Sequence, residues 1–167
     1  MMTRKNKALA GVTGAAAAAI LFAIVPQFEG TILRGYLDPV GIPTKCMGDT
    51  TDVEVGRHYT EAECRASLED ELIAHAEPVL ACVPQLAGRT YQLAASVSFA
   101  YNIGSGAFCG STAARRFRAG DWWGGCKAFN ESDSGRPQWV TARGRVLPGL
   151  VKRRAAERAL CETGLAP

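Results

Sequence analysis

The chain has 167 residues, 47% of them hydrophobic, and a formal net charge of +3. This length supports one good hydrophobic core and excludes two sizeable domains. Arg4, Lys5 and Lys7 account for the whole net charge, and no basic stretch is interleaved with aromatic residues, which argues against a nucleic-acid partner.

The other charges are unevenly distributed along the chain. Residues 49–77 hold nine acids and two bases, whereas residues 136–158 hold seven bases and one acid. A basic segment of this kind can serve to bind an anionic polymer. Charges of this kind more often form solvated helix faces and intramolecular ion pairs, which we take as the default interpretation.

Cysteine usage indicates an oxidising compartment. The cysteines lack the paired C-x-x-C spacing of a zinc site. Up to three disulfides therefore explain the number of cysteines better than a zinc site does. The only histidines are His58 and His75, and no H-E-x-x-H pattern is present, so we expect neither a catalytic metal nor a cofactor. The six cysteines are Cys46, Cys64, Cys82, Cys109, Cys126 and Cys161.

Residues 8–25 form an uncharged apolar run that ends at Pro26. As one helix it would span roughly 27 Å, just enough for a thin or locally deformed bilayer. Its eight alanines and two glycines make it a weak anchor. The run resembles the signal-anchor-release (SAR) segment of certain phage endolysins, a membrane helix that can later leave the bilayer.

This resemblance implies a location and partners. The positive-inside rule keeps the basic N-terminus in the cytoplasm and places the body on the periplasmic face of the host inner membrane. Release from the membrane would then deliver the protein to the periplasm. The implied partners are the host secretion machinery, which would insert the helix, and the inner membrane, which would hold it. A cleaved secretory signal is the alternative, but the run is long for one and no polar small-residue cleavage region follows it.

The stretch from residue 28 to residue 48 carries the candidate chemistry. Glu29 lies in a segment that we expect to finish as a helix near Gly35. Asp38 precedes a proline, and residues 38–41 suit a type I turn that reverses the chain. Thr44 would then return beside Asp38, facing the helix that carries Glu29, so the three side chains are predicted to share one small cleft.

Two carboxylates and a hydroxyl suit glycoside cleavage. One carboxylic acid protonates the leaving oxygen, and the second carboxylate activates water or attacks the sugar. Taken singly, each residue also has an ordinary role: Glu29 as a solvated helix residue, Asp38 in the turn and Thr44 in a strand.

Together these residues resemble the E-G-x-x-L-x-x-Y-x-D-x-x-G-x-x-T-x-x-x-G signature of phage lysozymes of the T4 type. The resemblance implies that Glu29 is the general acid, that Asp38 positions or activates water with inversion at the sugar, and that Thr44 assists. Cys46 and Pro43 depart from the common pattern of that family. The matching positions are Glu29, Gly30, Leu33, Tyr36, Asp38, Gly41, Thr44 and Gly48.

The rest of the chain is predicted to be helical. Thr60 to Glu63 form a capping box that opens a helix, which Pro78 should disturb. A central core helix is expected at residues 90–102, and a final helix at 148–162 resembles the ending of the same family. Shorter helices are expected at residues 112–119 and from the cap at Asp121 to about residue 130.

We pair Cys46 with Cys64, Cys82 with Cys109 and Cys126 with Cys161, because each pair joins neighbouring predicted elements. Cys46 has an alternative role in regulation, since it lies two residues from Thr44. None of residues 1–45 is cysteine, so no thiol of the apolar run is available to block the site.

The sequence therefore predicts an α+β, mostly helical, lysozyme-like fold with an N-terminal apolar helix. Residues 1–26 would form the SAR segment and residues 27–167 the catalytic domain, with residues 27–57 as catalytic helix and hairpin lobe and residues 58–167 as helical lobe. The expected activity is that of a monomeric phage endolysin that hydrolyses peptidoglycan glycan strands. A lytic transglycosylase and an inactive, membrane-tethered peptidoglycan-binding protein are the alternatives.

Overall fold

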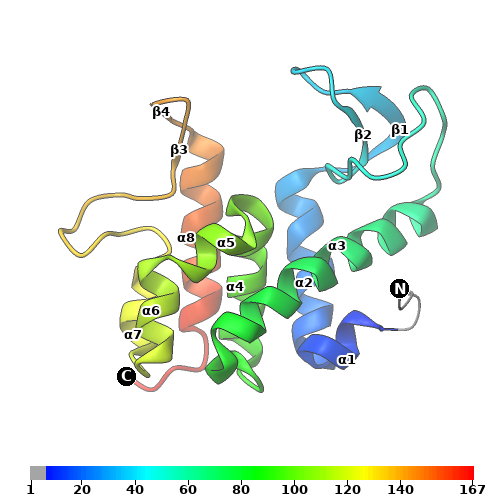
Figure 1. Cartoon of the computed structure of the whole chain (residues 1–167). Helices are drawn as coiled ribbons and strands as arrows, with labels where there is room; N and C mark the ends of the chain where they lie inside the picture. Colours follow the sequence, from blue (N-terminus) through cyan, green and yellow to red (C-terminus); the bar gives the residue numbers. More distant parts are fainter. Residues whose placement is uncertain (1–6) are drawn as a thin grey trace.

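A short hairpin stands on a larger helical body (Figure 1). The computed structural model describes residues 7–167 of the chain. Strands β1 (Ile32–Leu37) and β2 (Pro43–Cys46) pair antiparallel in the hairpin, and β3 (Thr141–Ala142) and β4 (Arg145–Val146) form a second small sheet across from it (Figure 1). The predicted α+β, mostly helical architecture with a hairpin lobe is confirmed.

The N-terminal apolar run forms two helices, α1 (Leu9–Thr13) and α2 (Ala15–Glu29), rather than the single helix expected. Gly14 separates them, and its φ of +88° is a conformation that favours glycine. The expected end at Pro26 is also wrong, because α2 continues to Glu29. No helix in the part of the chain that the structure describes is long and apolar enough to cross a membrane.

Burial explains why the N-terminal run folds onto the body as α1 and α2. Leu9, Leu21 and Val25 are fully buried in the common core, and α2 packs mainly on the central helix of the body. Packing of an apolar face stabilises a helix more than propensity does, so α2 tolerates a proline three residues from its end.

The hairpin begins earlier than predicted. We expected the helix of Glu29 to finish near Gly35, but Gly30, at φ +69°, ends α2 and β1 starts at Ile32. The predicted turn is confirmed, since the Gly41 N–H donates to the Asp38 carbonyl at 2.9 Å. In the ladder Thr44 is paired with Tyr36.

Helix α3 (Glu61–Cys82) opens with the predicted capping box. The Thr60 hydroxyl accepts from the Glu63 N–H at 3.1 Å, and the Glu63 carboxylate accepts from the Thr60 N–H at 2.8 Å. The helix runs past Pro78 and ends four residues later, so the proline does not end it.

The central helix α4 (Thr90–Ile103) has buried side chains on almost every face, as the predicted core helix requires. Phe99 of α4 packs against the rings of Phe108, Phe129 and Trp139. Around it lie α3, α2 and α8 (Pro148–Glu162), and the bounds of α8 are those predicted. The other helical elements are η1 (Pro84–Leu86), α5 (Ser105–Cys109), α6 (Thr112–Arg118) and α7 (Trp122–Lys127).

Three disulfides join the elements, and all three pairings are those predicted. Cys46–Cys64 links the hairpin to α3, Cys82–Cys109 links α3 to α5, and Cys126–Cys161 links α7 to α8. Cys46 is therefore a structural cysteine in this state, not a free thiol.

Candidate active site

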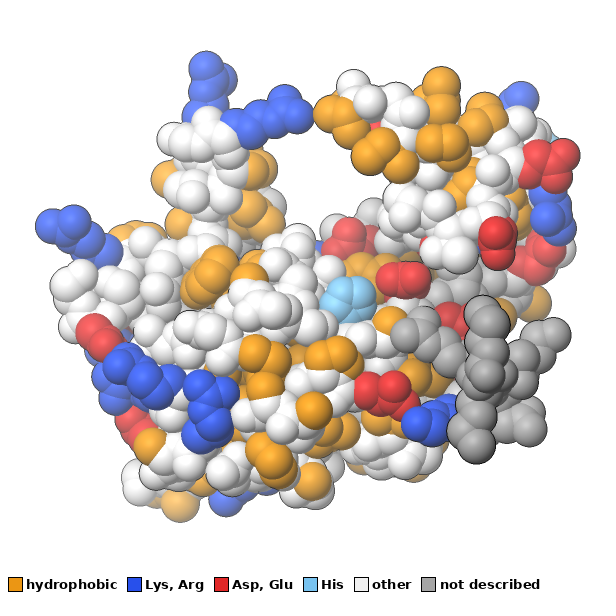
Figure 2. All heavy atoms as spheres, viewed as in Figure 1, with side chains coloured by type: hydrophobic (Ala, Val, Ile, Leu, Met, Phe, Trp, Pro, Cys, Tyr) orange, Lys and Arg blue, Asp and Glu red, His pale blue; other side chains and the backbone are white. Residues whose placement is uncertain are grey.

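Glu29 lies at the C-terminal end of α2 and lines a cavity of about 460 Å³. Its side chain is 24% exposed, so solvent and a ligand can both reach the carboxylate. The molecule is hollowed between the hairpin lobe and the part that carries β3 and β4 (Figure 2). The cavity is lined by Phe28, Glu29, Asn102, Leu147, Pro148, Gly149, Leu150 and Arg153.

Arg153 of α8 is the closest polar partner of Glu29 that the structure shows. Its Nη1 forms an ion pair with the Glu29 carboxylate, and its side chain is only 5% exposed. Arg153 belongs to the final helix predicted at residues 148–162, for which the sequence indicated no catalytic role. The excess of bases at residues 136–158 was the available signal, but by itself it predicts only solvated helix faces and intramolecular ion pairs, without saying which side chain reaches the site.

Behind Arg153 lies a second carboxylate, that of Glu157, which is completely buried beside Arg154. Burial raises the pKa of Glu157, while the two arginines and the Ser98 hydroxyl oppose the rise by favouring the charged form. Burial likewise lowers the pKa of Arg154, and its pairing with Glu157 opposes that change. The site therefore holds two carboxylates on opposite sides of one guanidinium.

In the hairpin, Asp38 and Thr44 both hydrogen-bond to the backbone of Ile42. Asp38 Oδ1 accepts from the backbone N–H groups of Val40 at 2.9 Å and Ile42 at 2.8 Å. Thr44 is buried, and its hydroxyl donates to the Ile42 carbonyl at 2.9 Å. Among residues 7–167, Asp38 Oδ2 has no hydrogen-bond partner, so this oxygen is available to a water molecule or a ligand.

The structure does not place all three predicted residues around one cavity. Asp38 and Thr44 do not line the cavity that contains Glu29. They belong to the hairpin lobe, whereas the cavity is formed by the end of α2, the end of α4 and the start of α8. A ligand that contacts both groups would have to span the hollow between the lobes.

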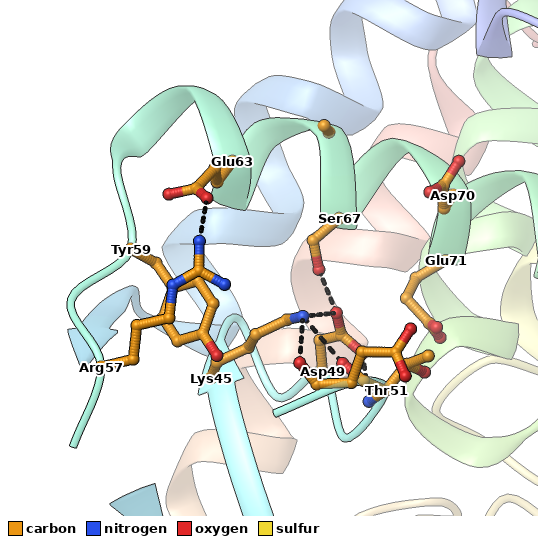
Figure 3. A pocket seen from close by; sticks show the side chains of 11 residues that line it. Lys45, Asp49, Thr51, Arg57, Tyr59, Glu63, Ser67, Asp70 and Glu71 are labelled. Carbon is orange, nitrogen blue, oxygen red and sulfur yellow. Dashed lines mark hydrogen bonds and ion pairs between the residues drawn. The ribbon is translucent and has the colours of Figure 1, made fainter. Parts of the chain in front are cut away.

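A second cavity, of about 540 Å³, lies where the hairpin meets α3 (Figure 3). Lys45 Nζ donates to the Thr51 carbonyl at 2.7 Å and lies 3.6 Å from the Asp49 carboxylate, which also accepts from the Ser67 hydroxyl (Figure 3). These contacts secure the loop after β2 to α3. The hairpin is thereby held at a fixed place on the helical body.

Tyr101 of α4 makes a further link to the hairpin lobe. Its hydroxyl donates to the Met47 carbonyl at 3.0 Å, and its ring lies 5.3 Å from that of His75. Burial and the nearby Glu29 carboxylate raise the pKa of Tyr101, so the phenol stays protonated and remains a donor.

A family model described as Phage lysozyme matches residues 26–157. The SAR-endolysin of Bacteriophage PS119 is 34% identical over 166 residues, covering 96% of this chain and 95% of that protein. The SAR-endolysin of Enterobacteria phage P21 is 33% identical, covering 95% and 96%.

A solved structure shares the fold. The active form of the P1 phage endolysin Lyz superposes with a TM-score of 0.75 at 23% identity, covering 93% of this chain and 87% of that one. At that identity the likeness concerns the fold alone.

Proposed function

The chain belongs to the phage lysozyme family, and from this premise we propose that Glu29 is its general acid and that Asp38 and Thr44 hold the attacking water. The protein is an endolysin, a glycoside hydrolase of the muramidase class, and its substrate is peptidoglycan. The observation that carries the proposal is the Glu29 carboxylate on the wall of the cavity formed by the ends of α2 and α4 and the start of α8.

In the proposed reaction, the protonated Glu29 carboxyl gives its proton to the glycosidic oxygen between N-acetylmuramic acid and N-acetylglucosamine. The C1–O bond breaks as positive charge develops on the sugar ring, and a water molecule held by Asp38 Oδ2 attacks C1 from the opposite face. Asp38 accepts a proton from that water. The product sugar is then inverted, and the two carboxyl groups should lie roughly 6.5 to 9.5 Å apart in the complex.

The roles are tested by substitution in the full-length chain. Glu29→Gln should abolish release of muropeptides from purified peptidoglycan, because the Gln amide has no acidic proton to transfer, whereas the melting temperature should stay near that of the parent. Asp38→Asn should lose most activity, and Thr44→Ser should keep part of it because the hydroxyl remains. Glu162→Gln, which alters a partly exposed ion pair at the end of α8, is the matched control.

The products decide between two reactions. A reducing muramic end in a mass-resolved digest identifies hydrolysis, whereas an anhydro-muramic end identifies a lytic transglycosylase. Full activity of Glu29→Gln would refute the assignment of the acid. Retention of anomeric configuration in the first product would refute the role of Asp38 and point to a covalent intermediate.

We further propose that residues 8–25 first hold the protein in the host inner membrane and later leave it. The SAR-endolysin names of the relatives support this, as does the weak hydrophobicity of the run. In the described state the same residues are packed on the body as α1 and α2, and α2 leads directly into Glu29. Residence in the bilayer would remove this support from Glu29, which explains why a tethered enzyme would be inactive.

Strengthening the anchor tests this proposal. Leucine at Gly11, Gly14 and several alanines should favour insertion by at least a few tenths of a kcal/mol per position, and so delay lysis. Lysis as early as that of the parent would contradict release. A mature N-terminus after residue 25, determined by intact-mass measurement, would instead indicate a cleaved signal.

A further inference from the structure

The buried charges of α8 form a chain of contacts that ends at Glu29. Arg153, Arg154 and Glu157 are 4%, 0% and 1% exposed, so all three are shielded from bulk water. Charged groups at this depth persist only when they are paired and hydrogen-bonded. Their partners therefore determine where each group points.

Glu157 is held from two helices. Its Oε1 accepts from the Ser98 hydroxyl of α4 at 2.8 Å and from Arg153 Nε at 3.0 Å. Arg154 lies beside the same carboxylate, with its Nη2 3.2 Å from Oε1 and its Nε 2.7 Å from Oε2. Displacing Glu157 Oε1 would take the acceptor from the Ser98 hydroxyl, Arg153 Nε and Arg154 Nη2 in the core.

This anchoring determines the orientation of Arg153. A guanidinium is planar and its N–H groups point in fixed directions. Arg153 uses Nε on Glu157 and Nη2 on the Ser98 carbonyl, at 3.1 Å, so Nη1 is aimed at the Glu29 carboxylate. The two buried contacts of the guanidinium, to Glu157 and to the Ser98 carbonyl, thus fix its third contact, to Glu29 at the cavity.

We propose that Glu157 is a positioning residue for the reaction: by fixing Arg153, it holds the Glu29 carboxyl in the orientation needed to protonate the leaving oxygen. This inference rests on the proposed role of Glu29 as the acid. Without the charge of Glu157, Glu29 would be the only carboxylate left to pair with Arg153 among the contacts described. The Arg153 guanidinium could then turn toward Glu29. The acid would then be misplaced with respect to the substrate.

Glu157→Gln in the full-length, oxidised protein tests the inference, because Gln keeps the shape and one acceptor but removes the charge. The maximal rate of muropeptide release should fall by roughly tenfold to a hundredfold, the scale expected for an ångström-sized misplacement of a catalytic group. The substrate concentration at half-maximal rate should change little, because Glu157 lies outside the cavity. The control Glu162→Gln, on the same helix, should leave both parameters unchanged.

A double-mutant cycle separates positioning from a general loss of structure. If Glu157 acts through Arg153, then Glu157→Gln should cost little further rate in an Arg153→Met background. Additive losses would overturn the inference, as would a parental maximal rate for Glu157→Gln. If Glu157→Gln does not fold, Ser98→Ala provides the test: it removes one donor to Glu157 and should lower the maximal rate with the half-saturation concentration kept.

The outcomes distinguish this inference from the proposed function. Activity in Glu29→Gln would refute the acid itself. An inactive Glu29→Gln together with a fully active Glu157→Gln would leave the acid in place and refute only the positioning role.

Discussion

The N-terminal run should stabilise the folded body, and Leu21→Ala measures by how much. Leu21 of α2 is fully buried in the core shared with α4. The substitution removes about three methylene equivalents, or roughly 2.4 kcal/mol of transfer free energy, and the cavity left behind adds to the loss. We expect the free energy of unfolding to fall by about 3 kcal/mol, which lowers the melting temperature of a chain of this size by roughly 6 to 12 °C.

The assay is thermal unfolding of the purified full-length protein, followed by circular dichroism with the disulfides intact. Leu37→Ala is the control, because the Leu37 side chain is 57% exposed and its truncation should shift the melting temperature by no more than about 2 °C. Equal shifts for the two variants would refute the reasoning. They would mean that residues 9–29 are not part of the cooperative core.

Three further predictions concern stability. Replacing Cys126 and Cys161 by alanine opens a 35-residue loop and should cost about 3.8 kcal/mol by the loop-entropy relation, measured by denaturant unfolding; a loss below about 1 kcal/mol would contradict it. Gly35→Ala should lower stability by about 1 to 3 kcal/mol, because the added Cβ would lie 2.1 Å from the Glu54 carbonyl oxygen; an unchanged melting temperature would show that the neighbouring loop yields freely. A guanidinium and a helix amide lower the pKa of Asp121 below its ordinary 3.8, so its contribution is present above about pH 4 and is lost as the pH falls through the lower folded value. Asp121→Asn should therefore flatten the dependence of stability on pH below about 4, and an unaltered slope there would exclude this contribution.

Several features of the fold are encoded locally, which is why the sequence predicts them. The capping box at Thr60, the turn after Asp38 and the bounds of α8 depend on side chains within a few residues of one another. Such interactions have characteristic spacings. The disulfide pairs also followed from the order of the elements, because each pair joins neighbours in the fold.

The structure around Glu29 was decided by tertiary contacts. The sequence suggested a helix that ends at Pro26 and another that continues to Gly35, but burial of α2 on the body carries one helix through the proline to Glu29. The pattern that contains Arg153 and Glu157 is as compatible with a solvated helix face as with a buried network. Only packing of α8 on the rest of the body, chiefly on α4, removes water from these charges, and a charge without water must find a partner. The partner of Arg153 lies 124 residues away in the sequence, and no local spacing encodes such a contact.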